Sequence, residues 1–260
     1  MKLPPFALLL AALCLACWPV LRWFVAGTLD GSNDCAGLLA AAAAAIIVLA
    51  PAREALARPL VLPCACLAVY LAATACQVPA PARSPLLALA ITALASSLRL
   101  GKRFDVALFT LCILALPLSA TLQFYLGYPL RVLAGDLSAF LLRMNGIAVA
   151  REGAMLAWQG QLVSIDAPCS GVKMLWAGLL LAGALAGAVR LSSLRTAVAL
   201  MLAIAAVVAA NAIRAAALFY MEAGIVHLPA SAHEAIGVVS FAAAGAGILF
   251  MTHRMERRAA

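Results

Sequence analysis

Cys169 differs from the other seven cysteines of the chain because it lies in a short polar segment directly before a long apolar run. It lies in the stretch SIDAPCSGVKMLW (residues 164–176). A thiol is a nucleophile only as the thiolate, and its pKa falls at a helix N-terminus or near a cation. If a helix begins at Ser170, Cys169 has the free N–H groups of the first turn, and Lys173 lies one turn further on. We therefore predict that Cys169 is a nucleophile, supported by Ser170, Lys173 and Asp166.

Two polar residues lie inside a later apolar run, in the sequence ANAIRAAALFY. Asn211 and Arg214 are three residues apart, so they share one face of a helix. An arginine inside an apolar span costs about 2.5–3.5 kcal/mol on insertion scales, which predicts that Arg214 faces a polar cavity and a partner. A developing oxyanion is such a partner. The alternative is a side chain that reaches from the helix end to the membrane surface.

His233 stands at the start of the last apolar run, in SAHEAIG. Histidine exchanges protons near neutral pH and is the commonest general acid and base. A lone histidine at this place is also compatible with a helix cap or a surface residue. Each of these residues alone has an ordinary structural explanation, so the prediction depends on whether Cys169, Arg214 and His233 meet.

The elements that position these residues are predicted to be helices in a membrane. The chain is 67% hydrophobic and 11% charged, whereas soluble domains have about 25% charged residues. Apolar stretches near 18 residues or longer recur along the whole length. We expect an all-α integral membrane protein that forms a single polytopic membrane domain, residues 1–260. Its parts are N-terminal helices without a motif (1–103) and a catalytic core (104–252).

Breaks in hydrophobicity predict about eight transmembrane helices. Runs rich in alanine suit close helix packing in lipid, where small residues let backbones approach. The predicted spans are about 5–26, 35–50, 59–78, 85–98, 104–125, 170–189, 196–219 and 235–252.

Loop charges orient these spans without reference to the candidate residues. With the N-terminus inside, 11 of the 18 basic residues fall in cytoplasmic segments, as the positive-inside rule requires. Cys169, Arg214 and His233 then reach the same outer face from three successive spans. We expect a multi-pass membrane protein with an extracytoplasmic site. The 11 residues are Lys2, Arg53, Arg58, Arg99, Lys102, Arg103, Arg190, Arg195, Arg254, Arg257 and Arg258.

One long extracytoplasmic loop, residues 126–168, leads the chain to Cys169. Its first part has apolar residues at helical spacing and the stop signal Asn145-Gly146, which predicts an amphipathic interfacial helix. Its second part reads as a short hairpin of two strands with Gly153 and Gly160 as turn residues.

Composition excludes several other classes of function. The net charge of +8 is mainly a topology signal, and no soluble basic module exists for nucleic acid. Cys64 and Cys66 have the wrong spacing for zinc, and the chain has three histidines, so we expect neither a metal nor a cofactor. Most cysteines lie in or beside apolar runs, where packing is the ordinary role.

Three motifs together resemble the exosortase/archaeosortase family of polytopic membrane cysteine transpeptidases. APCSGVKML, NAIR and HEAIG are similar to the Cys-Ser-Gly, Asn-x-x-Arg and His-x-x-x-Gly motifs of that family. The resemblance covers about residues 110–250, and it implies a place in the bacterial cell (inner) membrane. It implies that Cys169 is the nucleophile, Arg214 the oxyanion-stabilising or substrate-positioning group, and His233 the acid/base.

The leading hypothesis is a membrane-embedded thiol transpeptidase or protease. Its partners would be membrane lipids and membrane-anchored substrate proteins, whose C-terminal signals consist of a motif, an apolar helix and a basic tail. The enzyme would form a Cys thioester that water or a surface acceptor resolves. Alternatives are a transporter or anionic-lipid-handling protein that uses Arg214 and Lys173, and a non-catalytic assembly subunit. The choice between hydrolysis and transfer stays open. So do the identity of the acceptor, the cognate signal and the oligomeric state.

Overall fold

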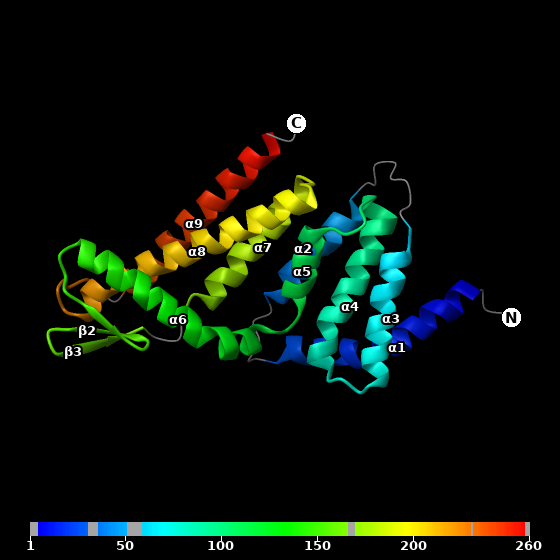
Figure 1. The fold of residues 1–260 in the computed structure, drawn as a ribbon, viewed down its shortest axis with the longest axis horizontal. Helices are drawn as coiled ribbons and strands as arrows, with labels where there is room; N and C mark the ends of the chain where they lie inside the picture. Colours follow the sequence, from blue (N-terminus) through cyan, green and yellow to red (C-terminus); the bar gives the residue numbers. More distant parts are fainter. Residues whose placement is uncertain (1–4, 31–35, 51–58, 166–169, 230, 258–260) are drawn as a thin grey trace. The chain divides into compact units, whose positions relative to one another are not determined.

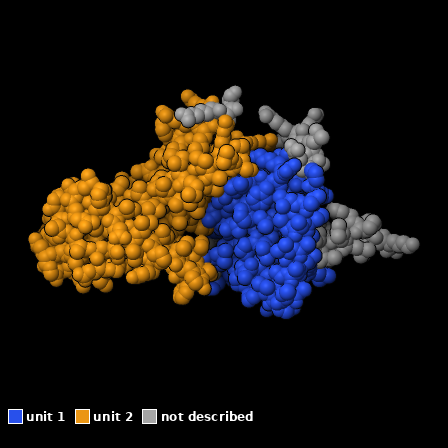
Figure 2. All heavy atoms as spheres, in the orientation of Figure 1, with its two compact units in different colours: residues 1–118 blue, residues 119–260 orange. Residues whose placement is uncertain are grey.

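The computed structural model describes residues 5–30, 36–50, 59–165, 170–229 and 231–257, with only the backbone of residues 5–14. The chain divides into two compact units, Met1–Leu118 and Ser119–Ala260 (Figure 2). The described residues are helical apart from one small sheet and the connections (Figure 1).

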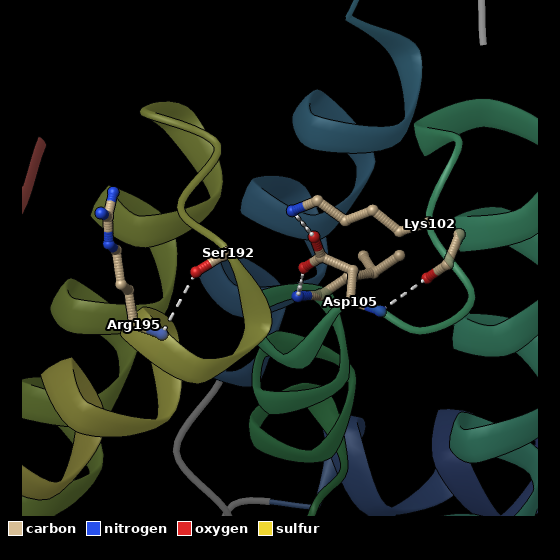
Figure 3. A network of polar contacts seen from close by, with 6 residues as sticks. Lys102, Asp105, Ser192 and Arg195 are labelled. Carbon is tan, nitrogen blue, oxygen red and sulfur yellow. Dashed lines mark hydrogen bonds and ion pairs between the residues drawn. The ribbon is translucent and has the colours of Figure 1, made fainter. Parts of the chain in front are cut away.

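Unit 1 consists of helices. Within it α3 packs against α4, and α2 against α5. Helix α5 begins after Asp105, whose carboxylate accepts a hydrogen bond from Leu108 N (2.9 Å) and pairs with Lys102 Nζ (2.7 Å; Figure 3). The elements are α1 (Pro5–Leu29), α2 (Gly37–Leu49), α3 (Val61–Ala75), α4 (Ala80–Ala95), the π-helical turn η1 (Ser96–Leu100) and α5 (Val106–Ala115).

Unit 2 contains the described residues of all three motifs. Its central helix is α8, which packs against α6, α7 and α9; Figure 1 shows α7, α8 and α9 side by side. Helix α8 begins after Ser192, whose hydroxyl accepts from Arg195 N (3.4 Å; Figure 3). The elements are α6 (Ser119–Met144), β1 (Ala150–Glu152), β2 (Met155–Trp158), β3 (Gln161–Ser164), α7 (Val172–Ala188), α8 (Ser193–Glu222) and α9 (Ser231–Arg257).

Small residues bring α7 and α8 into close contact. A Cβ added at Gly178 would lie 2.5 Å from Val207 Cγ2, so only glycine fits there. Ala182 and Ala203 are almost fully buried in the same cluster. Close approach of this kind is how apolar helices pack without bulky side chains, and it confirms the packing role expected for the alanine-rich runs.

The sheet is an antiparallel meander of order β1-β2-β3. The β2–β3 turn is Gln159-Gly160, both with positive φ (49° and 79°), as a tight two-residue hairpin requires. The sheet packs against α6 and α8 through Leu156, which is 1% exposed, in a cluster that also contains Leu142 and Phe219.

The region 104–144 differs from the prediction. The predicted span 104–125 is not one helix: α5 ends at Ala115 and α6 begins at Ser119. Pro117 explains the break, because it lacks an N–H and disfavours helical backbone at the residue before it. Helix α6 then continues through the predicted interfacial helix to the expected stop, where Gly146 has φ +80°.

Two further expectations change. The loop forms three strands where a two-stranded hairpin was predicted. Eight spans are not confirmed: among the described residues, three helices are long and apolar enough to cross a membrane, or four if α5 and α6 count as one bent span. Shorter apolar helices account for the rest, namely Leu15–Leu29, Gly37–Leu49, Val61–Ala75 and Val172–Ala188.

Candidate active site

Cys169 and Asp166 lie outside the described residues, so the site is built here from the residues that follow them. Ser170 is 3% exposed. Its Oγ donates a hydrogen bond to Gln123 Oε1 on α6 (3.2 Å) and accepts one from Val172 N (3.4 Å) at the start of α7. The residue bonded to the candidate nucleophile is therefore held between two helices.

Gly171 adjoins Asn211 of α8. Its φ of +81° is a backbone conformation that favours glycine. A Cβ at this position would also lie 2.8 Å from Asn211 Nδ2 and 2.9 Å from its Cγ. The Asn211 side chain, 4% exposed, thus packs directly on the backbone that leads into α7.

Arg214 lies on the same face of α8, one turn after Asn211, as the spacing predicted. Its guanidinium packs over Gly237 of α9: a Cβ there would lie 3.4 Å from Arg214 Nε and 3.6 Å from Cζ. Within the described residues, the buried Nε makes no hydrogen bond. A buried guanidinium donor of this kind is suited to an anionic group.

His233 lies in the first turn of α9, one turn before Gly237. Its Nδ1 is 4.0 Å from Glu222 Oε1 at the end of α8. Both residues line a small pocket whose remaining walls are mainly apolar and include Leu156, Ile165 and Phe219. The pocket thus lies where α8, which carries Arg214, meets the first turn of α9, which carries His233.

Helix α7 begins later in the structure than the sequence predicts. Helix α7 begins at Val172, two residues later than the predicted start of 170. The left-handed Gly171 separates Lys173 from Cys169, so these two residues are not one turn apart on a continuous helix. Lys173 is exposed in the second position of α7, and its supporting role at the thiol stays a prediction.

Two residues of this region were missed by sequence reasoning. Gln123 was counted as part of a predicted span, although a polar amide four residues before Gly127 in an apolar run was a usable signal. Glu222 belongs to none of the three motifs, so the sequence does not single it out. Its contact with His233 depends on the turn between α8 and α9, for which the sequence offered no distance.

The structure therefore brings the described motif residues together in unit 2. Gly171 lies beside Asn211, and Arg214 lies beside Gly237 in the α9 turn that follows His233. These contacts join segments that are far apart in sequence.

Comparison with known proteins agrees with the motifs. A family model described as transmembrane exosortase matches residues 6–250, a range that contains all three motifs. Comparisons with curated proteins and with solved structures gave no match. The resemblance noted from the three motifs is thus confirmed over nearly the whole length, and the chain belongs to the transmembrane exosortase family.

Proposed function

We propose that the protein is a membrane-embedded cysteine transpeptidase or protease that cleaves C-terminal sorting signals of secreted proteins. Family membership supports a transpeptidase-like role in the membrane. The observation that carries the finer proposal is the buried Arg214 Nε, which has no hydrogen bond among the described residues and packs one turn from His233. The active site would face the outside of the bacterial inner membrane.

The proposed reaction begins at Cys169. The thiolate Sγ attacks the scissile carbonyl carbon, and the carbonyl oxygen becomes an oxyanion that the Arg214 guanidinium stabilises. His233 gives a proton to the leaving nitrogen as the C–N bond breaks, which leaves a thioester on Cys169. Water or an acceptor nucleophile then attacks the thioester and transfers its proton to His233, and the thiolate departs.

Surroundings of the site support these assignments. Ser170, Asn211 and Gly171 order the backbone next to the nucleophile. The pocket beside His233 has mainly apolar walls, which would exclude water from part of the site and strengthen charge interactions there.

The test is co-expression with a protein from the same genome that ends in a motif, an apolar helix and a basic tail. Cys169→Ser should abolish processing while the enzyme still inserts, because a serine alkoxide is far harder to generate than a thiolate. Cys112→Ala is the matched control and should retain processing. Processing by Cys169→Ser at the wild-type rate would refute the proposal.

A further inference from the structure

Gln123 of α6 lies 47 residues before Ser170 in sequence, and the two side chains are hydrogen-bonded. The Ser170 Oγ uses its hydrogen to donate to Gln123 Oε1 (3.2 Å) and its lone pair to accept from Val172 N (3.4 Å). A buried hydroxyl with both capacities used has one preferred orientation. Gln123 therefore fixes the orientation of Ser170 relative to the first turn of α7.

Gly127 makes room for this arrangement. It is the residue one turn after Gln123 on α6 and is buried. A Cβ at Gly127 would lie 2.8 Å from Gln123 Nε2 and 3.2 Å from its Cδ. The amide of Gln123 thus folds back over Gly127, and any larger residue there must displace it.

Asn211 of α8 contacts the next residue, Gly171. Its amide lies against Gly171, as described above. Residues 170 and 171 are consequently contacted by a side-chain amide from α6 and by another from α8. A constraint from two helices suits a segment whose neighbour must meet a scissile carbonyl within a fraction of an ångström.

We infer that Gln123, seated on Gly127, is a positioning residue for the nucleophile, acting through Ser170 on the backbone bonded to Cys169. The inference rests on the proposed function, in which Cys169 attacks the substrate. Gln123 touches Ser170 and takes no part in bond making. Its loss should therefore lower kcat and leave KM unchanged.

Gly127→Ala is the most informative variant. Alanine favours a helix more than glycine does, and the atom that must move is the end of a flexible side chain, so the melting temperature should not fall. The displaced amide should nevertheless release Ser170 and lower kcat at least about tenfold, as expected for a misplaced reacting group. Gly247→Ala in α9 is the matched control, because its Cβ would meet only Met251 Cε at 3.9 Å.

Gln123→Leu should lower kcat as much as Gly127→Ala, and the double variant should be no worse than either single one, since both remove the same contact. Gln123→Glu retains an oxygen acceptor for Ser170 and should restore most of the activity. Unchanged kcat in Gly127→Ala and Gln123→Leu would overturn the inference. A loss of kcat that is accompanied by a fall in melting temperature in both variants would overturn it as well.

A second measurement separates this inference from the proposed function. In a background with the other seven cysteines replaced by Ala, the alkylation of Cys169 by iodoacetamide reports on the thiol without any substrate. Gly127→Ala and Gln123→Leu should slow alkylation, and Gly247→Ala should not. Unaltered alkylation in both variants counts against positioning, whereas normal processing by Cys169→Ser counts against the proposed function on which the inference rests.

Discussion

Arg214 and Asn211, on one face of α8, each pack against a glycine of another segment. Gly237 lies under the guanidinium of Arg214, and Gly171 lies under the amide of Asn211. Both glycines belong to the sequence motifs, and at each position the absence of a side chain admits a polar group. These motif residues thus pack as two pairs, each with one polar residue and one glycine.

Arg214 should be intolerant even of lysine. Lysine keeps the charge but loses the planar fork that presents several donors to one oxyanion. We expect Arg214→Lys to lower processing by about 10²–10³, the usual effect of losing an oxyanion donor. Arg195→Lys, at the other end of α8, is the control and should process normally. The measurement is processed product per inserted enzyme, and near-normal turnover by Arg214→Lys would favour a side chain that only reaches the membrane surface.

Substitutions at Gly237 should have graded effects. The 3.4 Å separation between a Cβ at Gly237 and Arg214 Nε is an ordinary contact, so Gly237→Ala should keep most of the activity. Gly237→Leu places further carbons where the guanidinium lies, and we expect it to impair processing about as much as Arg214→Lys. Equal activity of the alanine and leucine variants in the same co-expression assay would show that Arg214 does not depend on this contact.

At the scale of elements, glycine backbone and proline placement decide where α6 and α7 begin. Sequence patterns located most helices within a few residues, because apolar runs are local signals. The break at Pro117 was missed because hydrophobicity continues across it. The start of α7 was placed too early because an extended apolar run does not reveal that Gly171 is left-handed.

Alanine substitutions at Gly171 and Gly146 separate the effect of backbone strain from that of a steric clash. Their φ values are +81° and +80°, but a Cβ at Gly146 would meet nothing within 4 Å, whereas one at Gly171 would meet Asn211. Gly146→Ala should therefore cost only the strain of a left-handed residue, about 1–2 kcal/mol, and retain processing. Gly171→Ala should lose more stability and also most of its activity.

Thermal unfolding in detergent, together with the processing assay, measures both effects. Equal losses of stability in the two variants, together with normal processing by Gly171→Ala, would mean that processing does not depend on the contact with Asn211.

The site itself was predictable in part. The helical spacing placed Asn211 and Arg214 on one face, and this is confirmed. The roles of Cys169, Arg214 and His233 stay predictions, as do those of Ser170, Lys173, Asn211 and Asp166. The contacts of Gln123 and Glu222 could not be predicted, because they join segments whose approach depends on packing and turn geometry.

At the scale of the whole molecule, the membrane orientation governs which face carries the site. Loop charges predict that α9 starts outside and ends inside. His233 and His253 are 20 residues apart on α9, which is roughly 30 Å of helix and matches the thickness of the hydrocarbon core. The two ends of this helix therefore suit the two surfaces of the bilayer.

Single cysteines introduced into a variant with all eight natural cysteines replaced by Ala test this orientation. A maleimide that cannot cross membranes should label Asn145→Cys in intact cells, because this exposed position follows α6 on the outer side. It should label His253→Cys only after the cells are opened. The reverse pattern would place the site on the cytoplasmic face.

The most direct test of the central claim is the capture of the acyl-enzyme on Cys169. Enzyme and substrate protein are co-expressed, quenched in acid and digested, and the peptide that contains Cys169 is analysed by mass spectrometry. The proposed mechanism predicts a substrate acyl group on Cys169 that neutral hydroxylamine releases, as a thioester requires. An acyl group on another residue, or processing that continues after Cys169 has been fully alkylated, would contradict it.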